Sequence, residues 1–550
     1  MKKLLAILLA LTTLLGLCAC GGGGAQYQTE YTEDGRMIIT VGTVDSANVI
    51  DLDNNVLTNY IEEKCNVELK FEVYDSLEAA TQVNAAIGAR QQIPDLLVGI
   101  KLGWSTGWRY GNDGYYTDLT PYLEDEEGAS ETFWKRMEAL NEDDYSWVLD
   151  QMYDPDTGKV YGIPMVETSL IDTMRYMMWI NTEWLERLNL DMPTDPESLY
   201  TVLKAFKEND CNGNGDKTDE IPLFGSRVGG FGGDVVSWLM NMFVYWEEGQ
   251  PWIIDENGKL EAFYMTEEYR QGLSYVNKLY EEELLTSLAW SASLTEMKQI
   301  NTPSDGVPIC GIFAGHLSMH VRSDQLGILE QYEPLPTWGY ARRRRPDMKD
   351  AGYINGEISK EKQDKCFEIL MQLWTEEGSM LQRYGEKGVN WTDPDAGETS
   401  SLGLPAEYKI LTPVSGQHSI FWGGTCRFID MCEMETAQKS DPTTMDAFYV
   451  EKEKMHAEQN QLFTQAEQNN NPKKVIPALI YTKEEHEQWD TTMTNLGDRY
   501  RKAATEFMMG VMDPDDPTAW QKFKDQMVKL GYQDHKTLAQ TAYDRQLNNK

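Results

Sequence analysis

In the first hundred residues, segments with the hydrophobic pattern of β-strands take turns with segments that have the spacing of α-helices. Residues 37–41, 67–73 and 94–99 are apolar or strictly alternating runs, which predict β-strands. Residues 55–64 and 77–90 have apolar positions at helical spacing between them. The order strand, helix, strand, helix, strand predicts a mostly parallel, doubly wound sheet of the α/β class.

The same patterns continue along the chain. Residues 159–165 contain Gly and Pro and are predicted to be extended, and a second apolar strand is predicted at 308–313. A strand at 177–181 precedes a helix at 182–188, and residues 193–198 have the composition of a cap before a helix at 199–207. A chain of 550 residues is long enough for two or three domains, or for two large lobes.

An aromatic and glycine-rich stretch follows the strand that ends at Gly99. It contains Trp104, Trp108, Tyr110, Tyr115 and Tyr116, with Gly103, Gly107, Gly111 and Gly114 between them. This composition predicts a loop. Because ligands of open α/β sheets bind beyond the carboxyl ends of the strands, the loop is a candidate binding segment.

The N-terminus has the pattern of an export signal. Lys2 and Lys3 precede an apolar run, 4–17, that is too short to span a bilayer. The residues Leu-Cys-Ala-Cys at 17–20, which begin with the last residue of this run, resemble the lipobox of bacterial lipoproteins. The resemblance implies a signal peptide at 1–19, a lipidated, palmitate-bearing Cys20 and a flexible tether at 20–35, on the extracytoplasmic face of the cell membrane. An ordinary secretory signal is the alternative.

Composition narrows the possible partners. The formal net charge of −40 argues against nucleic acid and against adsorption to anionic lipids, so any membrane affinity must come from the lipid. We interpret the acidity as a solvated surface. The chain has 16 Trp and 28 Tyr but only 15 Phe. Trp and Tyr combine a flat apolar face with a polar edge, which suits the binding of sugar rings, although such residues also occur in protein cores. We expect a monomer.

Six cysteines remain after the signal and the lipidation site, at positions 65, 211, 310, 366, 426 and 432. Their spacing matches no CxxC or zinc pattern. Cys426 and Cys432 are close enough in sequence for a disulfide, but buried thiols are an equal alternative.

Several longer segments carry a family resemblance. They are GYYTDLTPYLE at 114–124, KVYGIPM at 159–165, WINTEWLERLNLDMPTDPESLYTVLKAFKENDCNGNGDKTDEIPL at 179–223 and WTEEGSMLQRYGEKGVNW at 374–391. With the lipobox, they resemble family 1 of the extracellular solute-binding proteins, the lipid-anchored carbohydrate receptors of ABC importers. The resemblance implies a type II periplasmic-binding-protein fold, in which extended crossover segments join two α/β lobes around a ligand cleft.

This resemblance also implies a domain division and a function. Lobe 1 is expected at 36–163 plus about 350–410, and lobe 2 at 164–349 plus about 411–550, with hinges near 162–164 and 354–356. The expected function is capture of an oligosaccharide and its delivery to ABC permease subunits, without catalysis. The alternatives are a receptor for a peptide or another small solute, a surface scaffold, and a polysaccharide-degrading enzyme, for which no motif is found.

Residues 210–220 form a candidate metal loop. Oxygen-bearing side chains at its positions 1, 3 and 5 and a glycine at position 6 match the opening of an EF-hand loop. The loop is shorter than an EF-hand, and the family resemblance implies a structural calcium ion. Its expected ligands are Asp210, Asn212, Asn214, Asp216, Asp219 and Glu220, with the last three the least certain in role. An Asn-Gly turn without metal is the alternative.

Candidate ligand-binding residues are nominated by position. They are Trp104, Trp108, Arg109, Asp172, Arg175, Trp238 and His316. Each follows a predicted strand, a crossover or a glycine run, and for each alone a packing role is an equal alternative. His316 and His320 lack a third metal ligand, so we interpret their spacing as coincidence. The run Arg342 to Arg345 is typical of a solvated loop, and recognition of an acidic group is its alternative.

Overall fold

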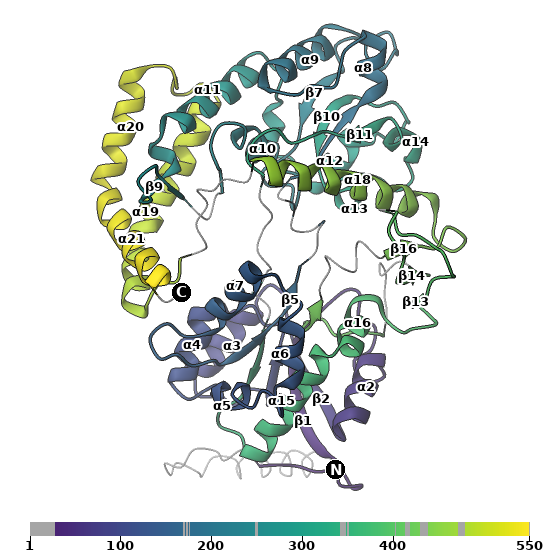
Figure 1. Ribbon diagram of the computed structural model, residues 1–550, viewed down its shortest axis with the longest axis vertical. Coiled ribbons are helices and arrows are strands. Elements are labelled where there is room, and N and C mark those ends of the chain that lie inside the picture. The colour runs from purple at the N-terminus through teal and green to yellow at the C-terminus, as the bar shows by residue number, and fades with distance from the viewer. Residues whose placement is uncertain are drawn as a thin grey trace, which may run out of the picture.

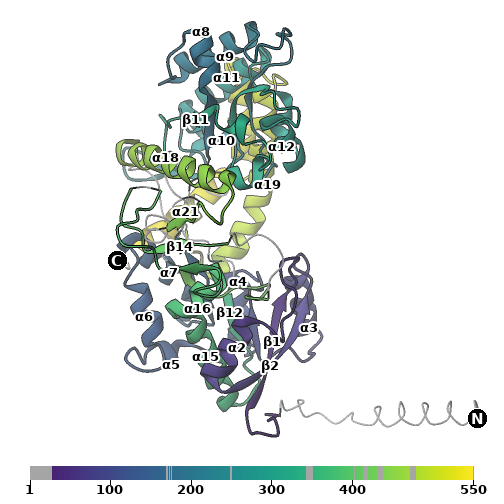
Figure 2. The ribbon, with the colours of Figure 1, turned by 90° about the vertical axis from the view of Figure 1, so that its right-hand side faces the viewer.

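The computed structural model describes residues 28–168, 171, 174, 176–247, 251–341, 348, 351–401, 403–412, 419–429, 438–470 and 479–548. Two α/β lobes lie one above the other, and the last three helices of the chain, drawn in yellow-green and yellow, lie beside the upper lobe (Figure 1). Figure 2 shows the two lobes from the side. Cys20, Asp172, Arg175, Cys432 and the run 342–345 lie outside the described residues. No described helix is long and apolar enough to cross a membrane.

The first lobe is built on a five-stranded sheet with the strand order β2-β1-β3-β12-β4. Its strands are β1 (Met37–Val44), β2 (Val67–Tyr74), β3 (Leu96–Val98), β4 (Gly162–Pro164) and β12 (Ala351–Ile354). β1 pairs in parallel with β2 and β3, as the sequence predicts, while β12 is antiparallel to β3 and β4. Strand β12 comes from a distant part of the chain and lies between β3 and β4 in the sheet.

Helices cover both faces of this sheet. They are α2 (Val56–Cys65), α3 (Ala79–Gly88), α4 (Trp104–Asn112), α5 (Thr120–Leu123), α6 (Glu131–Met137), α7 (Glu142–Met152), α15 (Lys360–Trp374) and α16 (Glu376–Tyr384). Helix α2 begins where its pattern predicts, because the Asn55 side chain accepts a hydrogen bond from the Leu57 amide. The buried side chains form two adjoining clusters, one on each side of the sheet.

Helix α4 differs from the prediction of a loop for this stretch. Two of its glycines face aromatic rings: a Cβ on Gly107 would lie 2.8 Å from the Tyr353 ring, and one on Gly111 would overlap the Tyr161 ring. The glycines therefore allow the helix to pack closely against the sheet rather than breaking it. This close packing outweighs their unfavourable helix propensity.

The second lobe has a four-stranded sheet with the order β11-β6-β10-β7. Its strands are β6 (Met178–Asn181), β7 (Ile221–Phe224), β10 (Cys310–Ala314) and β11 (Tyr332–Pro334), and a separate hairpin pairs β8 (Trp252–Ile254) with β9 (Leu260–Ala262). Its helices are α8 (Thr182–Leu188), α9 (Pro196–Glu208), α10 (Val235–Met240), α11 (Glu267–Glu281), α12 (Leu294–Asn301), α13 (Leu317–His320) and α14 (Leu326–Leu329). Short 3-10 turns occur at Phe263–Met265 and Ser287–Trp290.

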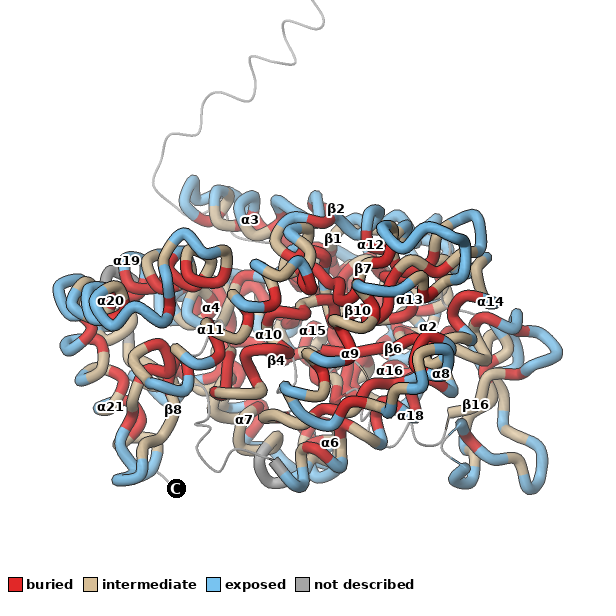
Figure 3. The backbone as a smooth tube through the Cα atoms, turned by 90° about the horizontal axis from the view of Figure 1, so that it is seen from above, coloured by how far each residue is buried: buried red, intermediate tan, exposed pale blue. Residues whose placement is uncertain are grey.

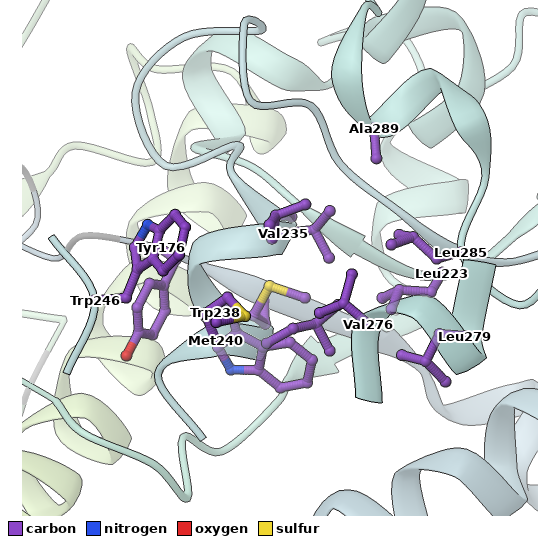
Figure 4. Close-up of a cluster of buried hydrophobic side chains, with 14 of the residues drawn as sticks. Tyr176, Leu223, Val235, Trp238, Met240, Trp246, Val276, Leu279, Leu285 and Ala289 are labelled. Carbon is purple, nitrogen blue, oxygen red and sulfur yellow. The ribbon is translucent and has the colours of Figure 1, made fainter. Parts of the chain in front are cut away.

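The largest core cluster lies in the second lobe and includes the C-terminal helices. Figure 4 shows part of it, with Trp238, Met240 and Val276 packed together. Helices α18 (Ala447–Asn470), α19 (Lys483–Met508), α20 (Pro517–Lys529) and α21 (Tyr532–Asn548) supply side chains to it. Most residues of the two sheets are buried, and the exposed residues lie mainly on the outer helices and loops (Figure 3). The edge strand β2 is the main exception, with Lys70, Glu72 and Val73 exposed.

The connecting strands near the lobe boundary pair with each other. β5 (Val166–Glu167) runs parallel to β15 (Phe428–Ile429), although about 260 residues separate them in the chain. Burial raises the pKa of the Glu167 carboxyl, but Arg427 at 3.0 Å and Arg383 at 3.6 Å outweigh this effect and lower it. This buried ion cluster holds the two connections together.

Two expectations about the lobe boundary are corrected. Residues 419–429, which the sequence placed with the second lobe, pack in the first lobe, where Trp422, Cys426 and Phe428 belong to its core. The hinges expected near 162–164 and 354–356 lie inside the first lobe, since β4 pairs with β12 and the Gly356 amide bonds to the Tyr115 carbonyl. A small sheet of β13 (Trp391–Thr392), β14 (Tyr408–Ile410) and β16 (Gln438–Ser440) adjoins this boundary.

Candidate ligand-binding face and metal loop

The segment 421–425 crosses the carboxyl ends of β1 and β3 in the first lobe. The Gly424 amide donates to Thr43 Oγ1 at 2.9 Å, and a Cβ on Gly423 or Gly424 would overlap the carbonyl oxygen of Val44 or Val98. Only glycine allows the two backbones to approach this closely. Sequence reasoning missed this segment, although the pair Gly423-Gly424 directly after two aromatic residues was a usable signal.

Alternate residues of this crossing segment have different surroundings. Trp422 is buried edge-on against Phe71 at 5.3 Å between ring centroids, and its Nε1 donates to Thr58 Oγ1 at 3.0 Å. Phe421 and Thr425 are half-buried. The buried positions anchor the segment to the lobe, and the half-buried ones remain partly accessible at the carboxyl edge of the sheet.

Helix α4 carries three of the nominated residues. Trp104 and Trp108 are half-buried, and their indole N–H groups donate to the carbonyls of Met348 at 2.9 Å and Met152 at 3.2 Å. Arg109 is exposed, with its guanidinium 4.8 Å from the centre of the Tyr110 ring. The two indoles therefore fix the helix against its neighbours, while Arg109 is available for charged or polar contacts.

His316 stands at the corresponding edge of the second lobe. It follows β10 and caps α13, with its Nδ1 accepting from the Ser318 amide at 3.2 Å, which places the hydrogen of the neutral ring on Nε2. The ring lies 4.6 Å from that of His456 and 5.7 Å from that of Phe231. Burial lowers the pKa of His316 to about 3, so the imidazole is neutral under physiological conditions.

The other nominated residues fall in different places. Trp238 is 1% exposed and packs beside Trp338 in the core, so the structure corrects its nomination as a ligand contact; Trp338 is half-buried beside it. His320 is fully buried, with its Nε2 2.9 Å from the Gly229 carbonyl, where it supports the glycine-rich loop. Asp172 and Arg175 lie outside the described residues.

Within the described ranges, no group of three His, Cys, Asp or Glu side chains is gathered as a metal site.

The loop 210–220 curls around its own side-chain oxygens. The two carboxylate oxygens of Asp210 accept from the amides of Gly213 at 2.7 Å and Gly215 at 2.9 Å. The side-chain oxygens of Asn212 and Asn214 accept from the amides two residues later. These bonds bend the loop into the turn that the spacing predicts.

The end of the loop contains unsatisfied carboxylate oxygens. Oδ1 of Asp219 and Oε2 of Glu220 are buried without a hydrogen-bond partner, while the other Glu220 oxygen accepts from the Cys211 amide at 2.7 Å. Burial, with a smaller contribution from Asp219, raises the pKa of Glu220. Two adjacent, unpartnered carboxylate oxygens fit a hard cation such as calcium. The side chain of Asp216 instead accepts from the Thr218 amide at 2.9 Å, which leaves its carbonyl as the other possible donor.

No protein-family model matches the chain. The chain is 32% identical over 144 residues to a fructooligosaccharide ABC transporter substrate-binding protein, FusA, of Streptococcus pneumoniae, covering 25% of the chain and 26% of FusA. It is 33% identical over 184 residues to the lipoprotein LipO of Bacillus subtilis, covering 31% of the chain and 30% of LipO. These alignments span less than a third of either relative.

Structural similarity extends over nearly the whole chain. An extracellular solute-binding protein from Bifidobacterium longum subsp. infantis superposes with a TM-score of 0.71 at 21% identity, covering 94% of this chain and 99% of that one. FusA in complex with kestose superposes with a TM-score of 0.68 at 18% identity, covering 93% and 100%. A FusA EF-hand mutant in complex with fructo-nystose gives 0.65 at 17%, covering 93% and 100%. The fold expected from the sequence is thus confirmed: the chain has the two-lobe α/β fold seen in these extracellular solute-binding proteins.

Proposed function

We propose that this protein binds an oligosaccharide between its two lobes and delivers it to the permease subunits of an ABC importer. The observation that carries the proposal is the superposition over the full length of FusA in complex with kestose. The partial sequence alignments with FusA and LipO support it independently. The sequence contains none of the catalytic motifs searched for, which favours a receptor over an enzyme.

The two sheet edges would contribute different groups to the ligand. Phe421 and Thr425 from the first lobe offer an aromatic ring and a hydroxyl, and His316 and Phe231 from the second offer a neutral imidazole beside a ring. Ring faces suit the C–H faces of a sugar, and neutral polar groups suit its hydroxyls. A ligand that contacts both lobes stabilises the conformation in which they are close together.

A thermal-shift screen of the lipid-free domain, residues 21–550, tests this function. Fructooligosaccharides, other neutral and acidic glycans, monosaccharides and short peptides are compared. The expected result is stabilisation by one glycan class, with the glycan recovered intact by chromatography. Cleaved product would show an enzyme, stabilisation by peptides alone would show a peptide receptor, and no stabilisation by any glycan would refute the proposal.

Residue variants show where the ligand binds. His316→Ala and Phe421→Ala are expected to weaken glycan binding, measured by calorimetry. Thr537→Ala, an exposed change on α21, is the matched control and should leave affinity unchanged. Unchanged affinity in both His316→Ala and Phe421→Ala would place the ligand elsewhere.

We also propose that the loop 210–220 binds a structural calcium ion. The unpartnered oxygens of Asp219 and Glu220 support this assignment, and the EF-hand mutant of FusA among the structural neighbours indicates such a loop in a relative. Calcium would neutralise the buried carboxylates and fix the loop between α9 and β7. Calcium should raise the melting temperature above its value in chelator, whereas Asp219→Asn should reduce the difference. An equal melting temperature in calcium and chelator would refute the assignment.

Anchoring through Cys20 remains a proposal from the N-terminal pattern. In a bacterial host, the full chain is expected in the membrane fraction with a lipid-modified N-terminus, measured by mass spectrometry. Cys20→Ala should abolish the modification and shift the protein from that fraction. An unmodified N-terminus in the wild type would indicate an ordinary secretory signal.

A further inference from the structure

Helix α18 holds the segment that carries His316 against the second lobe. The helix passes beside α13 on the side of this lobe that faces the first lobe (Figure 1). The His456 ring lies 4.6 Å from the His316 ring, and its Nε2 accepts from the Leu317 amide at 3.4 Å. One turn earlier on the helix, Lys452 Nζ donates to Ser318 Oγ at 3.1 Å. Leu317 and His456 are 139 residues apart in sequence, so the fold alone brings them together.

His456 is the link in a row of four aromatic side chains. The ring centroids are 6.1 Å apart between Trp179 and His456, and 4.6 Å apart between His456 and His316. The next ring, Phe231, lies 5.7 Å from His316. Trp179 and His456 are buried, whereas His316 and Phe231 are half-buried. The row therefore runs from the core of the lobe to the proposed ligand face, and each packed ring limits the directions open to the next.

The two imidazoles satisfy successive amides at the start of α13. His456 accepts from the Leu317 amide, and His316 Nδ1 accepts from the Ser318 amide at 3.2 Å. The first amides of a helix have no acceptor within it, and Leu317 is fully buried away from water. Burial keeps the pKa of His456 well below its ordinary value, so the ring is neutral. A neutral ring that accepts through Nε2 carries its hydrogen on Nδ1.

We propose that His456 is a positioning residue of the oligosaccharide site, which fixes the direction of His316 through the Leu317 amide and the contact between the two rings. The inference rests on the proposed function, because it explains how His316 is held for a ligand. An apolar ring at position 456 would fill the space but leave the Leu317 amide without its acceptor. A glutamine would supply an acceptor but no ring. Substitutions at this one residue therefore separate the hydrogen bond from the ring contact.

Nuclear magnetic resonance of the imidazole nitrogens tests this arrangement without a ligand. Residues 21–550 are labelled with ¹⁵N-histidine in calcium buffer, and the signals are assigned by their absence in His316→Ala and His456→Gln. We expect the hydrogen on Nδ1 of His456 and on Nε2 of His316. His456→Phe should shift or broaden the His316 signals, whereas Glu458→Gln, an exposed change on the same helix, should not. A His456 ring with its hydrogen on Nε2 would overturn the proposal, because it could not accept from Leu317.

Calorimetry with kestose, the sugar in the FusA complex, measures the consequence for binding. His456→Phe should weaken binding about tenfold through the misplaced His316, and His456→Gln, which keeps an acceptor, about threefold or less. In a His316→Ala background, His456→Phe should add less than about twofold, because a positioning residue acts only through the residue that it positions. An equal loss in both backgrounds would show a general structural role and overturn the proposal, as would wild-type affinity in His456→Phe.

The positioning role and the receptor function can fail separately. If another glycan from the thermal-shift screen binds in place of kestose, that glycan is used in the same cycle. If no glycan binds, the oligosaccharide function is refuted, while the ring-nitrogen signals still show whether His456 holds His316. If His456→Phe does not fold, the cycle is run with His456→Gln, whose smaller loss should also disappear in His316→Ala.

Discussion

Asp95 and Lys362 form a buried ion pair that connects the two chain segments of the first lobe. Lys362 Nζ lies 2.6 Å from Asp95 Oδ2, and the side chains are 7% and 3% exposed. The same oxygen accepts from the amide and the hydroxyl of Thr40, each at 2.8 Å. The pair joins β1 and β3 to α15. Between β3 and α15 in the chain lies the first segment of the second lobe.

We expect Asp95→Asn to lower the free energy of unfolding by about 3–5 kcal/mol, because it leaves the Lys362 ammonium buried without a counter-charge. Lys362→Met leaves the carboxylate with its two Thr40 hydrogen bonds and should cost about 2–3 kcal/mol. Removing both charges together should cost only about 1–2 kcal/mol, since no unpaired charge remains. The two single costs should therefore exceed the cost of the double variant.

Urea unfolding followed by tryptophan fluorescence measures all four proteins of this double-mutant cycle. Lys360→Met, a change at an exposed lysine two residues earlier on the same helix, is the control for loss of a surface charge. It should change stability by less than about 1 kcal/mol. The reasoning would be refuted by an Asp95→Asn variant as stable as the wild type, or by a double variant less stable than either single one.

Three further predictions concern the helix packing and the two candidate sites. Gly111→Ala should destabilise the protein by about 1–3 kcal/mol through overlap with Tyr161, whereas Gly88→Ala, with open space around its Cβ, should be neutral or slightly stabilising in the same urea assay. Because the pKa of His316 is about 3, calorimetry between pH 5 and 8 should show no affinity change due to its protonation; an inflection near pH 6.5 that His316→Gln removes would contradict this. In chelator, Glu220→Gln should raise the melting temperature, because burial raises the pKa of Glu220 and its ionised form therefore destabilises the folded protein at neutral pH. In calcium, the variant should be less stable than the wild type. Equal effects in chelator and calcium would argue against metal binding.

Local patterns were sufficient for most strands and capped helices. The alternation at 67–73 gave β2, and the cap composition before 199 gave α9, whose Asp195 side chain accepts from two backbone amides. These features depend on residues close together in sequence. The turn in the loop 210–220 was predictable for the same reason.

Long-range contacts explain the predictions that were wrong. The sequence predicts a loop where helix α4 forms, because nothing local shows that its glycines face Tyr353 and Tyr161. Trp238 was nominated because it follows a glycine run, but the helix that carries it turns the ring toward the core. The sequence places the segment 419–429 in the wrong lobe, because its two glycines fit against β3 and against β1, which lies about 380 residues earlier.

The crossing segment 421–425 has a mechanical consequence. It lies across the ends of β1 and β3, and a few residues later the same backbone forms β15, which is paired to the other connection, β5. A molecule that binds against Phe421 or Thr425 therefore contacts the chain that leads directly into β15, a connection between the lobes that is paired with a second one, β5. Because Trp422 and Gly424 fix this segment to the first lobe, we expect a ligand bound at the sheet edge to act on the paired strands β5 and β15 at the lobe boundary.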